Sequence, residues 1–524
     1  MDHIFVLITI LRNRKSLNKS TYLCFIDFKK AFDSVNRDLL MFKLSKVGVN
    51  GKMYRAILSL FRGPKARVIL NEIATDWFDC PIGVKQGDII SPTLFALYIN
   101  DLAEELKEAN LGVALDCDLV CILLYADDII LLAENEADLQ TLLNIVCSWC
   151  AKWRLEVNLQ KTNVMHVRRP GRSRTKTRFM FGNCEVPFCE EYKYLGITIH
   201  ETLNFQKSVD HLAESASRAL GSLVTKMIKN GGFPLKVYSK LYDSCVCSIS
   251  DYGSEVLGYS EYTSLERIHS RAIRAFLGVP KSTPIAGMRA ELGWIEPRSR
   301  TQMSLIRFYH RLINLPDERI TKRVFMWDLR MTNSNPDIST WSKEVKAVLE
   351  ENNLLGTFAL NPFNLPLIIS NLKSSMMQRD EEKLINTCKS LPKLRTYCSL
   401  VGDPGWRNYL AKPLSFIQRK FMAKLRLGVL PLRIETGRYE IPRIESKDRI
   451  CKQCAMQEVE DEEHFLLRCS KHSARRIALL SDIKLDNFGQ WDSNQKLVYL
   501  LNDSSMLKAT ARFIIESFEE RHIP

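Results

Sequence analysis

The chain has 524 residues, of which 46% are hydrophobic and 9% aromatic, values typical of packed globular domains and not of a disordered chain. Lysine and arginine outnumber aspartate and glutamate by 74 to 60, so the net charge of +14 favours a polyanionic partner, nucleic acid before membrane. No run approaches the ~18 apolar residues of a membrane span, and no secretory signal precedes the 15 cysteines, so an intracellular protein with reduced cysteines is expected.

The first part of the chain alternates strand-like and helix-like segments. Residues 21–28, TYLCFIDF, read as a buried strand. Asn36 is expected to cap a helix that stops at Gly48. The segment 81–106 then begins as a glycine-containing loop and continues as an apolar helix.

A hairpin and a helix follow. The strand-like runs DLVCILLY and IILLA are separated only by Ala126-Asp127-Asp128, which predicts a tight turn. Asn135 is expected to cap the next helix. One apolar stripe runs along that helix: Leu139, Leu142, Leu143, Val146, Trp149, Cys150 and Trp153. The order strand–helix–helix–hairpin–helix predicts an α+β domain in which this stripe covers a sheet face.

Later segments carry weaker patterns. The basic segment 166–178 has six lysines and arginines and no acidic residue, and two interpretations stay open: a solvated loop or a phosphate contact. Residues 191–199 read as a further short strand, and 203–440 as mainly helical. Cys147 and Cys150 are interpreted as core residues, because no second C-x2-C pair lies nearby.

Two adjacent carboxylates, Asp127 and Asp128, stand in an apolar run, where an unpaired charge is costly. Asp27 follows a predicted strand and is a plausible third carboxylate at an adjacent strand end. Such an oxygen-rich site suits Mg²⁺, and two ions there could act together on a hydroxyl and a phosphate. The alternative interpretation is an acidic pair that only caps a turn.

Five segments in order resemble the palm motifs of a reverse transcriptase: FIDFKKAFDSV, GVKQGDIISPTLFALYINDL, LLYADDIILLAE, WRLEVNLQKTNVM and YKYLGI. The likeness is closest to the reverse transcriptases of non-LTR (LINE-type) retrotransposons. It covers residues 1 to about 200 and continues more loosely through 248–297. It implies an RNA-directed DNA polymerase with a right-hand palm, an antiparallel sheet with helices on one face.

The resemblance assigns roles to the carboxylates and to two neighbours. Asp27 and Asp127 would hold two Mg²⁺ ions, with Asp128 beside them, for deoxynucleotidyl transfer to a primer 3′-OH on an RNA template. Phe32 falls at the family's aromatic steric gate against the ribose 2′-OH, with plain core packing as the alternative. Lys161 matches a lysine thought to protonate departing pyrophosphate, with a solvated surface lysine as the alternative.

The resemblance also names substrate-binding residues. Gln86 and Gly87 match the loop that positions template and incoming nucleotide, and Gly87 would allow close backbone approach. The primer-grip hairpin is matched by Tyr194, Leu195 and Gly196. The implied partners are an RNA template, a DNA primer or target, and deoxynucleoside triphosphates, with no membrane; the oligomeric state is left open.

The sequence departs from the family in two respects. Asp88 stands where the family commonly has an uncharged residue. The chain begins 26 residues before Asp27, so a chain truncated at its N-terminus is expected, with fingers and endonuclease domain absent. The predicted domains are 1–200, palm with the last fingers helix at 1–16; 201–300, thumb-like; 301–445, helical connector; 446–475, zinc unit; and 476–524, helical tail.

A cysteine–histidine cluster lies near the end. Cys451, Cys454, His464 and Cys469 have the spacing C-x2-C-x9-H-x4-C, and four such ligands suit one structural, tetrahedral Zn²⁺. A cluster of this kind also resembles the C-terminal one of non-LTR elements. His472 is a spare candidate ligand. The fold class expected is therefore an α+β palm followed by a mainly helical thumb and connector and a small C-terminal zinc-binding unit.

Other functions were weighed against this one. A catalytically inactive nucleic-acid-binding remnant of a truncated retroelement is the main alternative, since charge, basic segment and zinc unit would still allow binding. An RNA-dependent RNA polymerase is disfavoured by Ala-Asp-Asp in place of Gly-Asp-Asp, and a maturase by the 248–297 resemblance. Nucleus and cytoplasm are the expected compartments, and residues 168–178, RRPGRSRTKTR, could serve as a nuclear signal or only as a phosphate-binding loop.

Overall fold

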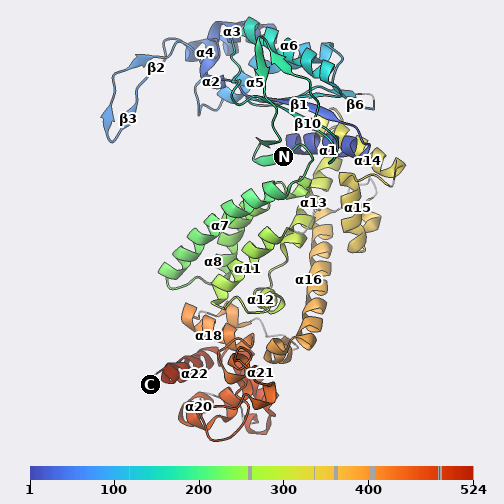
Figure 1. Ribbon diagram of the computed structural model, residues 1–524. Helices are drawn as coiled ribbons and strands as arrows, with labels where there is room; N and C mark the ends of the chain where they lie inside the picture. The colour runs from blue at the N-terminus through green and yellow to red at the C-terminus, as the bar shows by residue number, and fades with distance from the viewer. Residues whose placement is uncertain are drawn as a thin grey trace. The chain divides into compact units, whose positions relative to one another are not determined.

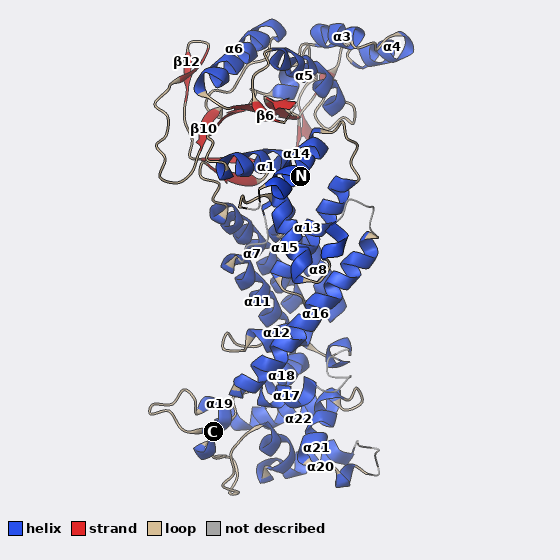
Figure 2. Cartoon of the chain, turned by 90° about the vertical axis from the view of Figure 1, so that its right-hand side faces the viewer, coloured by secondary structure: helices blue, strands red, loops and turns tan. Residues whose placement is uncertain are grey.

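The computed structural model describes all residues except 117, 258–261, 336, 359–363, 402–407, 413, 482, 484, 486 and 523–524. The chain divides into two compact units. The first comprises Met1–Phe205 with Arg311–Lys346, and the second Gln206–His310 with Ala347–Pro524. In the described chain the named strands belong to the first unit, and the second is built of helices (Figure 2). No described helix is both long and apolar enough to cross a membrane.

A four-stranded antiparallel sheet, in the order β10-β1-β9-β8, forms the centre of the first unit. Smaller two-stranded sheets surround it. The strands are β1 Thr21–Ile26, β2 Lys65–Ala66, β3 Ile69–Leu70, β4 Ile73–Ala74, β5 Phe78–Asp79, β6 Val113–Leu115, β7 Asp118–Val120, β8 Ile122–Tyr125, β9 Asp128–Ala133, β10 Asn163–Val167, β11 Phe179–Phe181, β12 Cys184–Val186, β13 Glu191–Tyr194 and β14 Ile197–His200.

The helices of the first unit lie on either side of this sheet (Figure 1). They are α1 Asp2–Ser16, α2 Ala31–Ser34, α3 Arg37–Lys46, α4 Gly51–Leu60, α5 Ser91–Glu108, α6 Glu136–Trp153 and α14 Ile320–Ser334. Every position of the predicted apolar stripe on α6 is buried, in one core cluster with α5 and with alternate residues of the sheet. All six residues of β1 are buried, so its second face is covered as well.

Local signals for helix ends are confirmed. The Asn36 side chain accepts a hydrogen bond from the backbone N–H of Leu39 and caps α3. The Asn135 side chain accepts one from Asp138 and caps α6. Such caps satisfy N–H groups that have no partner within the helix. Gly48, the predicted stop, follows α3 with a positive φ of 90°.

One strand prediction is corrected, and one strand of the central sheet was not predicted. The segment 191–199 is not one strand but the hairpin β13–β14, which turns at Leu195 and Gly196. The strand β10 was not predicted, although it pairs with β1 along five residue pairs. A partner strand more than a hundred residues away leaves no local signal in a sequence, because alternation alone does not say what a strand pairs with.

Residues 311–346 belong to the first unit, a long-range packing that the sequence did not indicate. Asn13 on α1 donates a hydrogen bond from Nδ2 to Oδ1 of Asp328 on α14, at 2.8 Å. Asp328 is completely buried and also accepts from the backbone N–H of Ser342 at 2.8 Å. These bonds offset the cost of burying the carboxylate and fix α14 against α1.

The second unit is helical, as expected for 203–440. Its helices are α7 Gln206–Lys229, α8 Leu235–Tyr242, α9 Ser248–Ser250, α10 Ser254–Leu257, α11 Thr263–Leu277, α12 Ile285–Leu292, α16 Leu365–Ser390, α17 Arg395–Val401, α18 Phe416–Arg426, α19 Arg433–Thr436, α20 Ser473–Ser481, α21 Ser493–Asn502 and α22 Leu507–Glu519. Helices α13 Pro297–Ile313 and α15 Trp341–Glu351 cross the boundaries of the units. The predicted names of the domains, palm, thumb, connector, zinc unit and tail, stay predictions.

Candidate active site and metal centre

Strand register places Asp27 next to the aspartate pair. Ile26, the last residue of β1, pairs with Ile129 of β9, so Asp27 lies opposite Asp128 as the antiparallel strands continue. Tyr125 pairs with Asp128 across the β8–β9 hairpin, which makes Ala126 and Asp127 the turn. Ala126 has φ of +53°, as tight two-residue hairpin turns require. Asp128 therefore begins β9, whereas the sequence had placed it in the turn.

The three carboxylates interact electrostatically. Burial raises the pKa of Asp128, and the negative charges of Asp127 and then Asp27 raise it further. Among the described residues, the one group of three or more side chains already arranged to hold a metal ion is the C-terminal cysteine–histidine group, not these carboxylates. Three half-buried carboxylates that repel one another nevertheless fit a divalent cation, which would relieve the repulsion.

Asp27 is held by the segment that follows α6. The backbone N–H of Asn158 donates to the Asp27 carbonyl oxygen at 2.7 Å, and its Nδ2 donates to Oδ2 at 3.2 Å. Lys161 Nζ lies 3.7 Å from the same Oδ2. The structure thus brings the predicted Lys161 to the carboxylate centre. Asn158 was missed, although it stands in the motif WRLEVNLQKT and could have been considered with it.

The loop before α5 packs on the residues after Asp27. The Val84 N–H donates to the Phe32 carbonyl oxygen at 2.8 Å, and Gln86 Nε2 donates to both carboxylate oxygens of Asp33 at 3.1 Å. The Phe32 ring stacks on Phe95 with centroids 4.8 Å apart. Gln86 and Phe32 are far apart in the sequence, and these hydrogen bonds bring them to the same side of the site.

Gly83 and Gly87 in this loop differ in what surrounds them, and the expected close approach of Gly87 to a nucleotide stays a prediction. A Cβ at Gly83 would lie 2.6 Å from the Asp33 carbonyl oxygen, which leaves room for no other residue. At Gly87 a Cβ would meet no protein atom within 4 Å, and it is the positive φ of 85° that favours glycine there. Asp88, the residue that departs from the family pattern, accepts a hydrogen bond on its carboxylate from the backbone N–H of Ile90, just before α5.

The β13–β14 hairpin lies close to the carboxylates. The Tyr192 ring stacks on Phe25 of β1, with centroids 4.0 Å apart. Burial raises the pKa of Tyr192 to about 12, and the charges of Asp128 and Asp27 contribute to the rise. Tyr194 is buried, and its hydroxyl has no hydrogen-bond partner within the described chain. The predicted residues 194–196 are thus the turn of a hairpin packed against the central sheet.

A cleft of about 750 Å³ opens beside Asp27. Its charged lining has four basic residues, Lys29, Lys30, Arg154 and Lys161, and three acidic ones, Asp27, Asp33 and Glu156. Lys29 pairs with Glu156. Lys30 and Arg154 both have positive φ, 47° and 57°, an uncommon conformation for residues other than glycine. The cleft therefore gathers positive charge next to the carboxylates, as a phosphate-bearing ligand would require.

Most of the basic segment 166–178 is engaged within the chain. Internal contacts are made by Arg168, Arg169, Arg172 and Arg174. Arg168 and Arg174 pair with the buried carboxylate of Glu201, at 2.6 and 2.7 Å. Arg168 and Arg174 are therefore neutralised within the chain, whereas Arg169, Arg172, Lys176 and Arg178 are exposed, and both interpretations of the segment stay open.

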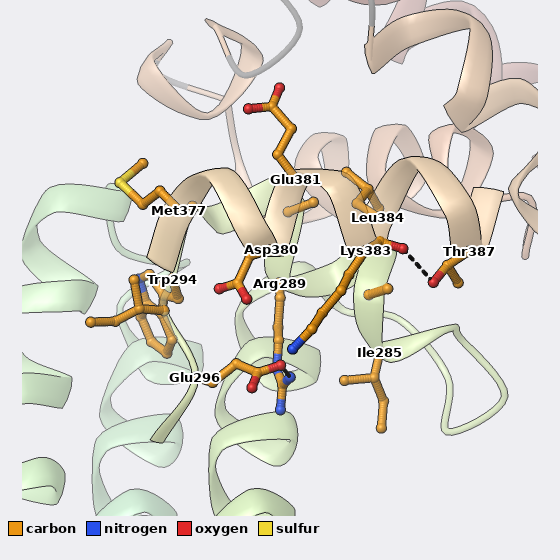
Figure 3. A pocket seen from close by; sticks show the side chains of 14 residues that line it. Ile285, Arg289, Trp294, Glu296, Met377, Asp380, Glu381, Lys383, Leu384 and Thr387 are labelled. Atoms are coloured by element: carbon orange, nitrogen blue, oxygen red, sulfur yellow. Dashed lines mark hydrogen bonds and ion pairs between the residues drawn. The ribbon is translucent and has the colours of Figure 1, made fainter. Parts of the chain in front are cut away.

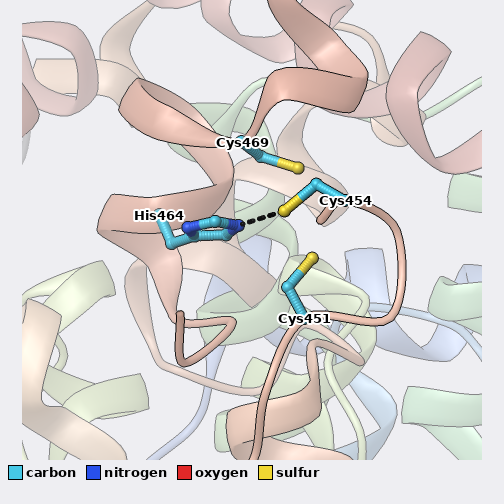
Figure 4. A group of neighbouring side chains, drawn as sticks. All are labelled: Cys451, Cys454, His464 and Cys469. Atoms are coloured by element: carbon cyan, nitrogen blue, oxygen red, sulfur yellow. Dashed lines mark hydrogen bonds between the residues drawn. The ribbon is translucent and has the colours of Figure 1, made fainter. Parts of the chain in front are cut away.

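The C-terminal cluster brings together all four predicted ligands (Figure 4). Cys454 Sγ lies 3.4 Å from Nε2 of His464. Nδ1 of His464 lies 2.9 Å from Oε2 of Glu458, the kind of second contact that orients a histidine toward a metal. The spare candidate His472 does not belong to the group; its ring packs against Phe465 instead.

The thiols of this cluster differ in acidity. Burial raises the pKa of Cys451 to about 12. Burial would also raise the pKa of Cys454, but hydrogen bonds from the Met456 backbone and from its cluster neighbours outweigh it and lower that pKa to about 7. A thiol whose pKa is lowered toward neutral pH, together with two further thiols and the imidazole of His464, is a donor set that could bind zinc.

Comparison with known proteins identifies the first unit's type of domain. Residues 3–199 match the family model described as "Reverse transcriptase (RNA-dependent DNA polymerase)". The match spans the carboxylates, the Gln86 loop, Lys161 and the β13–β14 hairpin. The chain therefore carries a reverse transcriptase domain.

Curated relatives come from insect retrotransposable elements. A type-1 retrotransposable element R2 polyprotein of Nasonia vitripennis is 24% identical over 56% of this chain and 28% of its own length. The RNA-directed DNA polymerase from mobile element jockey of Drosophila funebris is 25% identical over 51% of this chain and 30% of its own. The type-2 element R2DM polyprotein of Drosophila melanogaster is 21% identical over 91% of this chain and 43% of its own.

The chain thus spans less than half the length of these relatives. Among solved structures, apo telomerase from Candida Tropicalis matches 71% of this chain and 56% of its own, with 12% identity and a TM-score of 0.31. A TM-score of that size supports no argument about fold or function. The curated relatives that resemble this chain are thus proteins of the retrotransposable elements R2 and of the mobile element jockey.

Proposed function

We propose that this chain, whose residues 3–199 form a reverse transcriptase domain, is an RNA-directed DNA polymerase of a non-LTR retrotransposon. The observation that carries the proposal is the placement of Asp27 opposite Asp128, with Asp127 at the adjoining hairpin turn. The reaction would add a deoxynucleotide to the 3′-OH of a primer paired with an RNA template, with release of pyrophosphate.

Asp27, Asp127 and Asp128 would hold the Mg²⁺ ions, which when bound supply charge neutralisation at phosphate and activation of a hydroxyl. Burial and then the negative charges of Asp127 and Asp27 raise the pKa of Asp128, and a bound cation would offset these effects, which supports the assignment. Asn158 would fix the Asp27 side chain, because its amide occupies one of the carboxylate's hydrogen-bonding positions at 3.2 Å.

Lys161 and the basic cleft would handle the phosphate groups. The ammonium of Lys161 is exposed, lies next to Asp27 and could donate a proton to the departing pyrophosphate. Lys30 and Arg154 line the same cleft and make no ion pair within the described chain. They would add positive charge where a triphosphate approaches the carboxylates.

Phe32, Gln86 and Gly87 would select and position the nucleotide. The Phe32 ring is held against Phe95, so a rigid aromatic face would stand where a ribose 2′-OH has to fit. Gln86 is anchored on Asp33, which keeps the loop close to the same wall. Tyr194, Leu195 and Gly196, at the β13–β14 turn, would contact the primer strand.

The cluster of Cys451, Cys454, His464 and Cys469 would hold one structural Zn²⁺. Support comes from its four convergent soft ligands and from Glu458 behind His464. Few regular elements surround this part of the second unit, so a metal would supply much of its local stability.

The direct test is extension of a DNA primer on an RNA template by the full chain with Mg²⁺ and deoxynucleotides. Template-directed extension supports the proposal. Intact binding of the primed template without any extension would instead favour the inactive, nucleic-acid-binding remnant.

A further inference from the structure

A cavity of about 310 Å³ lies within the second unit, between α12 and α16 (Figure 3). Its size is at the lower end of the range usual for small-ligand pockets, ~300–1,000 Å³. Charged side chains enter it from both helices, and the indole of Trp294 forms part of its wall. No residue of the proposed polymerase site lines it.

The aromatic wall is held in place. Trp294 Nε1 donates a hydrogen bond to Ser239 Oγ at 3.0 Å. The indole stacks on Tyr242, with ring centroids 4.4 Å apart and planes 18° from parallel. Trp294 is therefore a fixed platform on the side of the cavity, and another planar group could stack there at little entropic cost.

Two of the charges in the cavity neutralise each other. Arg289 of α12 pairs with Glu296 through Nη1 and with Glu266 of α11 through Nη2. Its guanidinium is thus used by the fold and is not offered to a ligand. The carboxylates of Glu296 and Glu266 are likewise paired with Arg289.

Outside the pairs of Arg289, three charged residues of α16 line the cavity: Asp380, Glu381 and Lys383. We consider Asp380 and Lys383. Both line the cavity, three residues apart on one helix, and both side chains reach from α16 toward α12. Neither side chain makes a hydrogen bond or ion pair within the described chain. Burial and then the charge of Glu296 raise the pKa of Asp380, and the positive charges of Lys383, Arg289 and Arg379 offset the rise only in part.

We propose that this cavity binds a single unstacked guanine base of an RNA strand, with Trp294 as the stacking platform, Asp380 as acceptor and Lys383 as donor. Guanine presents donors at N1 and N2 and acceptors at O6 and N7, which match a carboxylate and an ammonium. Adenine has an acceptor at N1, where guanine has a donor, and its donor is at N6. Its N1 lone pair would therefore face the carboxylate, which is also an acceptor. Splayed bases stacked on aromatic side chains are how proteins read single-stranded RNA.

The inferred base-binding site is separate from the polymerase site. It rests on the proposed function in one respect only, that the bound base belongs to an RNA strand. The test is binding of the full chain to the RNA pentamers UUGUU and UUAUU, without Mg²⁺ and without deoxynucleotides. UUGUU is expected to bind about tenfold more tightly than UUAUU. Asp380→Asn and Lys383→Gln are each expected to remove most of that preference.

The controls are two substitutions on the exposed side of α16. Glu382 hydrogen-bonds only to Gln378, and Lys389 is exposed, and neither lines the cavity. Glu382→Gln and Lys389→Gln should keep the preference for guanine. Equal binding of the two pentamers, or a preference that survives Asp380→Asn and Lys383→Gln together, would overturn the proposal.

Two further arms separate the remaining possibilities. Free GTP should bind more weakly than UUGUU, because the acidic lining repels a triphosphate; GTP that competes equally with the pentamer would overturn the assignment to a strand. Asp127→Asn should leave the pentamer preference unchanged. If the unsubstituted chain extends no primer but still prefers UUGUU, the result contradicts the proposed polymerase and not this site.

Discussion

Nζ of Lys161 lies 3.7 Å from Oδ2 of Asp27. The lysine side chain is 69% exposed, and an ion pair so open to water contributes little to stability, about 0–1 kcal/mol. The pair is therefore better explained by chemistry at Asp27 than by the needs of the fold.

Replacement of Lys161 by alanine should therefore slow the reaction and spare the fold. Loss of a proton donor at the leaving group is expected to lower kcat on the order of 100-fold, with the melting temperature almost unchanged. Steady-state incorporation and thermal unfolding measure the two quantities. Lys176→Ala, an exposed lysine outside the site, is the matched control. An equal loss in this control would remove the assigned role.

The ionised carboxylate of Asp128 should lower the free energy of unfolding at neutral pH. Its pKa is raised in the folded chain by burial, Asp127 and Asp27, so the folded chain binds more protons than the unfolded one above about pH 3.9, the ordinary aspartate value. Stability is then lost as pH rises through the raised pKa. Asp128→Asn is expected to raise the melting temperature at pH 7 on the order of 1 °C, and not at pH 3.

The control for that experiment is Asp38→Asn, an exposed carboxylate in the first turn of α3. Differential scanning calorimetry without divalent cations gives the comparison. A melting temperature for Asp128→Asn below that of the natural chain at pH 7 would mean that the three carboxylates do not repel one another.

Phe32 should determine the choice of sugar. Removal of the ring by Phe32→Ala opens the space that a 2′-OH needs, so the preference for deoxynucleotides over ribonucleotides is expected to fall about 10- to 100-fold. Competing single-nucleotide incorporation measures this ratio. Phe32→Tyr keeps the ring on Phe95 and should keep the ratio. A ratio unaffected by Phe32→Ala would leave only core packing as the role of this side chain.

Zinc should be bound by the C-terminal cluster with one ion per chain. Cys454→Ala is expected to abolish binding, and Glu458→Gln to weaken it about 10- to 100-fold, because Glu458 orients His464. Metal analysis and competition with a chelator give both values. Cys245→Ala, an exposed cysteine of the same unit, is the control. Full zinc content in Cys454→Ala would refute the assignment of the ligands.

Local features of the fold were predictable from the sequence. The stripe on α6 repeats at helical steps, so its burial followed from periodicity alone, and the caps at Asn36 and Asn135 from residue type. The β8–β9 hairpin followed for the same reason, because its two strands adjoin in sequence. Asp27, Asp127 and Asp128 were identified because they lie in segments that resemble reverse transcriptase motifs, FIDFKKAFDSV and LLYADDIILLAE.

Long-range features were not predictable in the same way. β1 pairs with β10, and Asn13 hydrogen-bonds to buried Asp328, although both pairs lie far apart in the sequence. The local sequence of either partner does not indicate what it will contact. The arginines of the basic segment 166–178 looked available for phosphate, yet Arg168 and Arg174 converge on Glu201, a residue whose position only the folded chain reveals. Charge counts do not show which charges are already paired.

The most direct measurement is Mg²⁺-dependent extension of a primed RNA template by the full chain, by Asp127→Asn and by the control Asp38→Asn. Loss of the Asp127 carboxylate removes part of the metal-binding charge, so extension should disappear in Asp127→Asn and persist in Asp38→Asn, with template binding equal in all three. Extension by Asp127→Asn at the natural rate would contradict the assignment of the carboxylates as the catalytic centre.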